Sequence, residues 1–185
     1  FFLLDSRLRG NDGDLKFIFG NEMKLYGDLK SGNCYKVALL LKQLGIAHEF
    51  VNIDIMNGGS RTADFLAKNP NGKIPLLEIS PGQYLPESNA ILWYLAEGSA
   101  FLPEDKFQRA QVLQWLFFEQ YSHEPYIATA RFIKVYLGNP PERQAALQQK
   151  ISHGYQALDV MEKHLAANKF FVGGRYSIAD IGLYA

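Results

Sequence analysis

The sequence of 185 residues contains a single cysteine, Cys34. One cysteine excludes an intrachain disulfide framework and any metal site built from several cysteines. Ser31-Gly32-Asn33-Cys34 has the spacing of a C-x-x-C redox motif, but a serine stands where the first cysteine would be. Dithiol chemistry within the chain is therefore excluded, and we interpret Cys34 as a small buried residue in the first turn of a helix.

The sequence also lacks a charge excess and a long apolar run. Lys and Arg together number 19, as do Asp and Glu, so the formal net charge is zero. This balance gives no indication of a nucleic-acid partner or an acidic membrane partner. No apolar stretch approaches the roughly 20 residues of a transmembrane helix. With 48% hydrophobic and 21% charged residues, the composition is that of an ordinary globular protein.

Residues 1–22 differ in character from the rest of the chain. Residues 6–14 are polar, contain two glycines and follow no period, which is typical of a disordered arm. The apolar start, Phe1 to Leu4, is too short for the core of a signal peptide. Met23 immediately precedes the first strand-like run. We therefore expect residues 1–22 to be a disordered or foreign leader and Met23 to be the natural start.

Hydrophobic periodicity predicts two domains that meet near residues 99–103. Residues 23–97 read as strand, helix, strand, short helix, strand, strand and helix. A strand–helix–strand crossover followed by a hairpin and a helix makes a small mixed sheet with helices on its faces. Strand-like runs then stop, and long helices follow. We expect an α/β domain over residues 23–99 and an all-helical domain over residues 104–185.

Two long helices are predicted in the second domain. The first spans residues 105–137, and Pro125 should kink or split it. The second ends near Ala167. Apolar spacing assigns an inner face to the second helix, made of Ile151, Tyr155, Leu158 and Leu165. The first helix is rich in aromatic residues, and one stripe of it contains Leu113, Leu116, Phe117 and Gln120.

A helix start is also predicted close to the end of the sequence. Ser177 followed by Asp180 is the pattern of a capping box, with aspartate at the acidic position. The sequence stops at Ala185, after about two turns of the expected helix. We therefore expect the C terminus of the helical domain to be truncated.

The stretch from Asn69 to Ser88 has the strongest pattern for ligand binding. Asn69-Pro70-Asn71-Gly72 favours a turn, and a proline at a strand start leaves the backbone of Ile74 able to pair with an extended ligand. Ser88 is suited to cap a helix whose amides can hold a carboxylate, and Glu87 can pair with an ammonium group. The alternative is ordinary helix capping beside a trans edge-strand proline, which spacing alone favours.

Five motifs, taken in order, resemble the glutathione transferase superfamily. They are Lys24-Leu25-Tyr26, Ser31-Gly32-Asn33-Cys34-Tyr35-Lys36-Val37, Asn69-Pro70-Asn71-Gly72-Lys73-Ile74-Pro75, Glu87-Ser88-Asn89-Ala90-Ile91 and Ser177-Ile178-Ala179-Asp180. Each motif alone is weak, and the ordered set is specific. The resemblance covers residues 23–185 and is closest to bacterial, serine-type members of theta-, delta- or nu-like kind. It implies a thioredoxin-like first domain, an all-α second domain and a cis Ile74–Pro75 bond.

The resemblance implies roles for residues of the first domain. Ile74, with Pro75, would pair by its backbone with the cysteinyl part of glutathione. Glu87 and Ser88 would hold the γ-glutamyl group, and Lys73 borders the site, where it could meet the glycyl carboxylate. Surface lysines are more often merely solvated.

Ser31 matches the position of the catalytic serine or cysteine, and Asn33 is a second candidate donor to the thiol. A hydroxyl donor and a helix N-terminus both stabilise a thiolate relative to a thiol. Without the resemblance, Ser31 would be interpreted as a loop residue or an N-cap. Tyr26 is catalytic in other classes, but here we expect it to pack at the strand end.

Aromatic and basic residues on the first long helix form a candidate region for a second substrate, namely Tyr121, Tyr126 and Arg131. An aromatic stripe at helical spacing is more often core than binding surface. The expected protein is a cytoplasmic, homodimeric glutathione transferase without a metal. It would add glutathione to a small electrophile, or use it to reduce a peroxide or disulfide. The alternative is a non-catalytic binding or regulatory protein of the same fold.

Overall fold

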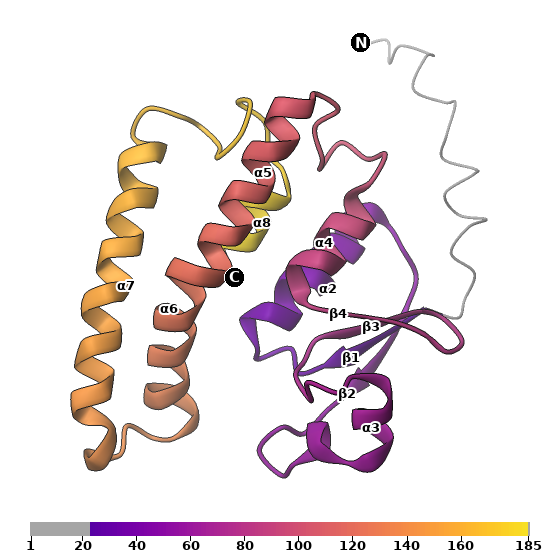
Figure 1. Cartoon of the computed structure of the whole chain (residues 1–185), viewed down its shortest axis with the longest axis vertical. Coiled ribbons are helices and arrows are strands. Elements are labelled where there is room, and N and C mark those ends of the chain that lie inside the picture. Colours follow the sequence, from indigo (N-terminus) through magenta and orange to yellow (C-terminus); the bar gives the residue numbers. More distant parts are fainter. Residues whose placement is uncertain (1–22, 185) are drawn as a thin grey trace, which may run out of the picture. The chain divides into compact units, whose positions relative to one another are not determined.

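A computed structural model describes residues 23–184 of the chain (Figure 1). The predicted leader, residues 1–22, lies outside the described residues, as does Ala185. The chain divides into two compact units, the first ending at Ile91 and the second beginning at Leu92. This division falls within a helix, and the domain limits expected from the sequence stay a prediction.

The first unit is built on a four-stranded sheet with the order β2-β1-β3-β4. The strands are β1 (Lys24–Gly27), β2 (Glu49–Asn52), β3 (Leu76–Ser80) and β4 (Gln83–Pro86). The helices are α2 (Gly32–Leu44), α3 (Ala63–Lys68) and α4 (Ser88–Ala96), with a 3-10 turn η2 (Gly59–Arg61). Strand β1 pairs in parallel with β2 and antiparallel with β3. The element order predicted from hydrophobic periodicity is confirmed.

The register of the sheet brings three segments to one end of it. Tyr26, near the end of β1, pairs with Leu76 at the start of β3. Leu76 in turn pairs with Pro86 at the end of β4. The loop after β1, the residues before β3 and the residues after β4 therefore leave the sheet at the same edge.

The core of the first unit comes from apolar residues of its first helix and of two neighbouring strands. Val37, Leu40 and Leu41 on α2 are fully buried, as are Leu25 on β1 and Leu77 on β3. Helix α2 ends at Gly45, whose φ of 69° is the left-handed conformation that glycine adopts without steric cost.

The helical unit contains α5 (Lys106–Phe118), α6 (Glu124–Arg131), α7 (Gln144–Leu165) and α8 (Ile178–Tyr184). Between α5 and α6 lies a π-helical turn, η3 (Glu119–His123), and a second one, η4 (Phe132–Tyr136), follows α6; a 3-10 turn, η5 (Pro141–Arg143), precedes α7. The single helix predicted over residues 105–137 is thus interrupted just before Pro125. Pro125 stands in the first turn of α6, directly after the π-helical turn, and its fixed φ suits the start of a helical segment.

The inner face predicted for the second long helix is wrong. Tyr155 on α7 is 64% exposed, Leu158 and Leu165 are also exposed, and Ile151 is half-buried. On the stripe of the first long helix, Leu116 is buried and Phe117 is 70% exposed. The buried residues of α7 are instead Leu147, Gly154 and Ala157. Small residues face α6 because the two helices approach closely: a Cβ added at Gly154 would lie 2.8 Å from Ile127 Cδ1.

The predicted capping box of α8 is confirmed. The Asp180 carboxylate accepts from the Ser177 amide at 2.8 Å and from the Ser177 hydroxyl at 3.1 Å. Its other oxygen accepts from the Phe171 amide at 3.0 Å, which also fixes the preceding loop. Across residues 23–184, we find no helix whose length and apolar character would let it cross a bilayer.

Candidate functional site

The loop after β1 presents Ser31 at the start of α2. The Asp28 carbonyl accepts from the Ser31 amide at 2.9 Å, and the Asp28 carboxylate accepts from the Lys30 amide. Ser31 is the N-cap residue, with extended backbone (φ −77°, ψ 125°), and its side chain makes no capping hydrogen bond. The hydroxyl of an N-cap serine normally accepts a hydrogen bond from a backbone amide in the first turn of its own helix. Here the helix does not use the hydroxyl in that way.

Cys34 is buried beneath this helix start. Burial raises the pKa of the Cys34 thiol to about 11, against the opposing effect of hydrogen bonds that include one with the Ser31 side chain. Gly27 allows the close packing, because a Cβ there would lie 2.7 Å from the Cys34 sulfur. Cys34 is therefore a neutral thiol at ordinary pH, as expected for a packing residue and not for a nucleophile.

The turn before β3 is organised by the side chain of Asn69. Asn69 is 2% exposed, and its amide nitrogen donates to the Lys73 carbonyl at 2.8 Å while its amide oxygen accepts from Asn71 N. Arg61 donates from Nη1 to the Asn71 carbonyl at 3.1 Å. The sequence predicted the turn but not this positioning role. The signal available in the sequence was an asparagine that opens an Asn-Pro-Asn-Gly turn.

The expected peptide-binding segment follows that turn. The Ile74–Pro75 bond is cis, which confirms what the resemblance implied. Lys73 is exposed, Ile74 is half-buried and Pro75 is buried. The register of β3 with β4 puts this segment next to Glu87 at the same end of the hairpin.

Glu87 and Ser88 stand at the start of α4, and the N-cap lies one residue before Ser88, the residue predicted to cap this helix. Glu87 is exposed and has a φ of 70°, and its backbone carbonyl accepts from the Ile91 amide at 2.9 Å, so it occupies the N-cap position. Ser88 is the first helical residue and is 5% exposed. Its hydroxyl is not a cap: it donates to Asn33 Oδ1 at 3.1 Å.

This hydrogen bond joins the starts of two helices. Asn33 belongs to the first turn of α2 and Ser88 to the first turn of α4, 55 residues further along the chain. Helix starts carry partial positive charge and amide donors without intrahelical acceptors. The site can therefore hold a carboxylate at one helix start and stabilise an anion such as a thiolate at the other.

Tyr26 has a structural role at the end of β1. Its hydroxyl donates to Glu78 Oε2 at 2.6 Å. Burial, and then this bond to Glu78, raise the pKa of Tyr26 well above its ordinary value. Burial would raise the pKa of Glu78, but hydrogen bonds from Tyr26, Gly82 and Tyr84 outweigh it and lower that pKa. Tyr26 is thus engaged within the sheet, as expected.

The three residues of the expected second-substrate region have different surroundings. Tyr126 on α6 stacks on His153 of α7 at 4.9 Å between ring centres. The Arg131 guanidinium lies 5.6 Å from the centre of the Tyr136 ring. Tyr121 is 84% exposed. Their role in binding a second substrate stays a prediction.

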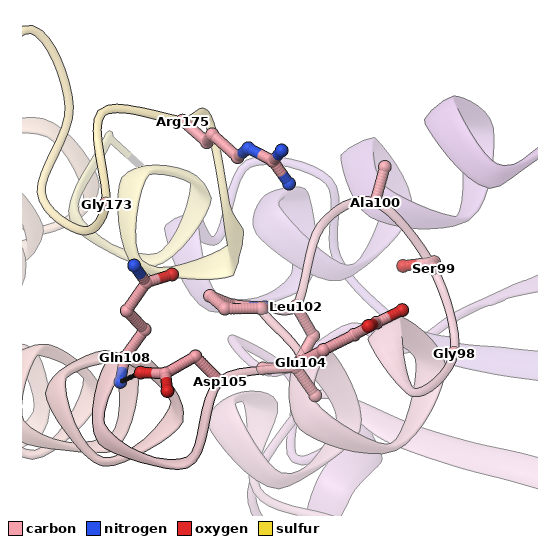
Figure 2. Close-up of a pocket in the computed structure, with 10 residues that line it drawn as sticks. Gly98, Ser99, Ala100, Leu102, Glu104, Asp105, Gln108, Gly173 and Arg175 are labelled. Atoms are coloured by element: carbon pink, nitrogen blue, oxygen red, sulfur yellow. Dashed lines mark hydrogen bonds between the residues drawn. The ribbon is translucent and has the colours of Figure 1, made fainter.

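The helical unit also has a hollow of about 650 Å³ that contains none of the predicted site residues (Figure 2). It lies beside the N-terminus of α5, where Asp105 accepts from the Gln108 amide at 2.9 Å. Its lining is Gly98, Ser99, Ala100, Leu102, Pro103, Glu104, Asp105, Gln108, Gly173 and Arg175. Among the residues that the structure describes, no cluster of three or more His, Cys, Asp or Glu side chains could hold a metal ion.

Comparison with known families finds two matching models. Residues 21–97 match "Glutathione S-transferase, N-terminal domain", and residues 144–185 match "Glutathione S-transferase, C-terminal domain".

Similar structures and relatives cover most of the chain. A glutathione S-transferase structure from Pseudomonas fluorescens Pf-5 is 58% identical, has a TM-score of 0.86, and aligns over 88% of this chain and 81% of its own. A Pseudomonas putida glutathione transferase with one glutathione disulfide bound per subunit is 32% identical, with a TM-score of 0.77 over 89% of this chain and 73% of its own. The disulfide-bond oxidoreductase YghU of Escherichia coli K12 is 33% identical over 88% of this chain, which spans only 59% of YghU.

Proposed function

Since this chain belongs to the glutathione S-transferase family and is a glutathione-dependent transferase or reductase, we propose that Ser31 activates the glutathione thiol. A thiol with a pKa near ~8.5 is mostly protonated at neutral pH, and the thiolate is the nucleophile. The observation that carries the proposal is the Ser31 hydroxyl at the start of α2, which its own helix does not use as a cap. A hydroxyl donor and the positive end of a helix both favour the thiolate.

Glutathione would be held along the edge of the sheet where three segments meet. The backbone of Ile74 would pair with its cysteinyl residue, and Pro75 would stabilise that segment. The α4 start, with Glu87 and Ser88, would bind the charged γ-glutamyl group. Lys73, which is exposed, would meet the glycyl carboxylate.

A non-catalytic binding protein of this fold is the competing hypothesis. The enzyme is favoured by the set of residues proposed to hold glutathione, from Ile74 to Ser88, and by the Ser31 hydroxyl, which makes no capping hydrogen bond.

Conjugation to a small electrophile and reduction of a peroxide or disulfide use the same thiolate. The name of YghU, a disulfide-bond oxidoreductase, and the glutathione disulfide in the P. putida structure favour disulfides among the reducible substrates. We place the second substrate near Tyr121, Tyr126 and Arg131 on the helical unit.

We propose that the protein works as a homodimer in the cytoplasm. Phe107, Phe117 and Tyr121 are 70%, 70% and 84% exposed, and their spacing puts them on one face of the α5–η3 segment. Large exposed apolar side chains gathered on one face favour a protein interface. A single cysteine and dependence on glutathione fit a reducing compartment.

Substitution of Ser31 tests the proposed mechanism. Ser31→Ala should raise the pKa of the thiol of bound glutathione and slow conjugation at pH 7. The expected loss of transition-state stabilisation is about 2–4 kcal/mol, with little change in the affinity for glutathione. Raising the pH should restore part of the rate. Thiolate absorbance of bound glutathione over a pH series measures the shift directly.

The matched control is Cys34→Ser, which should keep most of the conjugation activity. If Ser31→Ala keeps its conjugation activity and Cys34→Ser loses it, the chemistry proceeds instead through a mixed disulfide at Cys34. If both variants are silent, Asn33 or an amide of the helix start becomes the donor.

A further inference from the structure

The buried hydroxyl of Ser88 is a hydrogen-bond donor in the structure. Ser88 is 5% exposed, and its Oγ donates to Asn33 Oδ1 over 3.1 Å. A serine hydroxyl has one proton and two acceptor lone pairs, whereas an amide oxygen can only accept. The one proton is therefore directed to Asn33, and a second acceptor at Ser88 has to compete for it.

A carboxylate bound at the start of α4 is such an acceptor. Glutathione would place its γ-glutamyl carboxylate there, beside the Ser88 hydroxyl and the first amides of the helix. Ser88 cannot donate to Asn33 and to the carboxylate at the same time. Both needs are met if the Asn33 amide makes a half-turn about its last side-chain bond, because its NH2 group then donates to Ser88 Oγ.

We propose that Ser88 and Asn33 form a hydroxyl–amide switch that couples carboxylate binding at the start of α4 to the orientation of the Asn33 amide at the start of α2. In one state Ser88 donates to Asn33. In the other state Asn33 donates to Ser88, and Ser88 donates to the carboxylate. No proton leaves its own residue in either step. This inference rests on the proposed function, since it takes glutathione as the ligand.

The switch gives the site a means of sensing the γ-glutamyl group. Asn33 lies two residues after Ser31, at the helix start that would receive the thiol. A γ-glutamyl carboxylate at Ser88 therefore changes which amide atom Asn33 presents at that helix start. A thiol peptide without the γ-glutamyl group, such as cysteinylglycine, leaves Asn33 in its first orientation.

A double-mutant cycle with S-methylglutathione tests the switch. This ligand has the γ-glutamyl carboxylate and no ionisable thiol, so calorimetry measures recognition alone. Asn33→Asp preserves the shape of the side chain, but an aspartate can only accept and retains the Ser88 proton. We expect it to weaken binding by about tenfold or more. In a Ser88→Ala background there is no proton to retain, and the same substitution should have an effect at least about threefold smaller.

Equal effects of Asn33→Asp in both backgrounds would mean charge repulsion alone and would overturn the switch. Asn52→Asp, an equal charge change at an exposed asparagine of β2, should leave affinity unchanged. Asn33→Ala gives a second comparison, because removing the acceptor releases the proton. It should bind S-methylglutathione about tenfold more tightly than Asn33→Asp, and equal affinities would overturn the proposal.

A spectroscopic measurement follows the amide itself. In ¹⁵N–¹H spectra, S-methylglutathione should shift the side-chain amide signals of Asn33 in the wild type and leave them in place in Ser88→Ala. Cysteinylglycine should not shift them in either protein. Unmoved Asn33 signals in a wild type that binds S-methylglutathione overturn this inference alone. A wild type that binds neither S-methylglutathione nor glutathione overturns the proposed function as well.

Discussion

Glu87 combines two properties that substitution can separate, namely its carboxylate and its left-handed backbone. Its φ of 70° costs a residue with a Cβ roughly 1 kcal/mol, which glycine avoids. Glu87→Gly should therefore leave the free energy of unfolding unchanged or raise it by up to about 1 kcal/mol, whereas Glu87→Ala keeps the strain. Both should weaken glutathione binding by roughly 1.5–3 kcal/mol, because each removes the partner of the ammonium group.

Calorimetry with glutathione and chemical denaturation of the two variants check this prediction. Unchanged affinity in both variants would show that Glu87 serves only the helix start. A loss in one variant alone would show that the backbone, and not the carboxylate, is recognised.

Cys34 should make stability depend on pH in the alkaline range. Its folded-state pKa of about 11 exceeds the ordinary value of 9.0, because burial disfavours the thiolate. The folded state thus holds this proton more tightly than the unfolded state. The contribution of Cys34 to stability is complete below pH 9 and is lost as the pH rises towards 11.

The difference in unfolding free energy between the wild type and Cys34→Ala isolates this group from the other residues that titrate there. Between pH 8 and pH 11 we expect the wild type to lose up to about 2–3 kcal/mol of unfolding free energy relative to Cys34→Ala. A constant difference over that range contradicts the burial argument.

Single residues show which parts of the site the sequence could predict. Ile74, Pro75, Glu87 and Ser88 stand in motifs, and the chemistry of each residue type suggested its use. The bond from Ser88 to Asn33 could not be predicted, because it joins residues 55 positions apart and depends on how two helices pack. The preference of serine for the N-cap position predicted instead that the Ser88 hydroxyl caps its own helix.

At the scale of an element, the turn before β3 has a glycine that positions the proposed binding segment. Gly72 has a φ of +62°, and a Cβ there would lie 2.9 Å from the Ser60 carbonyl oxygen and 2.5 Å from Arg61 Nη1. Gly72→Ala should destabilise the protein by about 2–3 kcal/mol through strained backbone and crowding. It should also weaken glutathione binding, because the turn holds the segment from Lys73 to Pro75.

Gly82, in the β3–β4 hairpin, is the matched control. Its φ is +78°, but no heavy atom lies within 4 Å of an added Cβ. Gly82→Ala should therefore cost only the backbone strain, about 1–2 kcal/mol, and leave glutathione affinity as it was. Denaturation and calorimetry on the two variants compare them directly. Equal losses of stability and of glutathione affinity in Gly72→Ala and Gly82→Ala would contradict the positioning role of the turn.

Helix α7 shows why periodicity predicts that a helix exists more reliably than it predicts the buried face. Apolar residues occur on more than one side of α7, and spacing selected the side that contains Tyr155. The structure buries Gly154 and Ala157 instead. Close contact with α6 requires small side chains, and hydrophobicity gives glycine no weight. A scale based on size would have identified this side.

At the scale of the whole molecule, the exposed aromatic face of α5 and η3 predicts self-association. Phe117→Glu places a charge within the proposed interface and should weaken the dimer by about 2 kcal/mol or more. Light scattering over a concentration series measures this change. Tyr155→Glu, at a residue 64% exposed on α7, should leave the dimer intact. A monomeric wild type, or equal effects of the two substitutions, contradicts this choice of interface.

The overall architecture was more predictable than the site because many residues report on it together. The alternation of strand and helix patterns over residues 23–97, and its disappearance afterwards, indicated an α/β part and a helical part. The fold that the resemblance implied is confirmed by the matched families and the similar structures. The interruption before Pro125 was predicted as a kink, but the π-helical form was not, since no residue type is specific for it.

The π-helical turn η3 makes the length of this segment as important as its residues. A π turn contains one residue more than an α turn. Deleting one residue from Glu119–His123 would remove this extra residue, and every later side chain would be turned by about 100° relative to α5. Tyr126 and Ile127 would then turn away from α7, and Gly154 would lose the neighbour for which it leaves room. At this place in the chain, a deletion acts as a rotation.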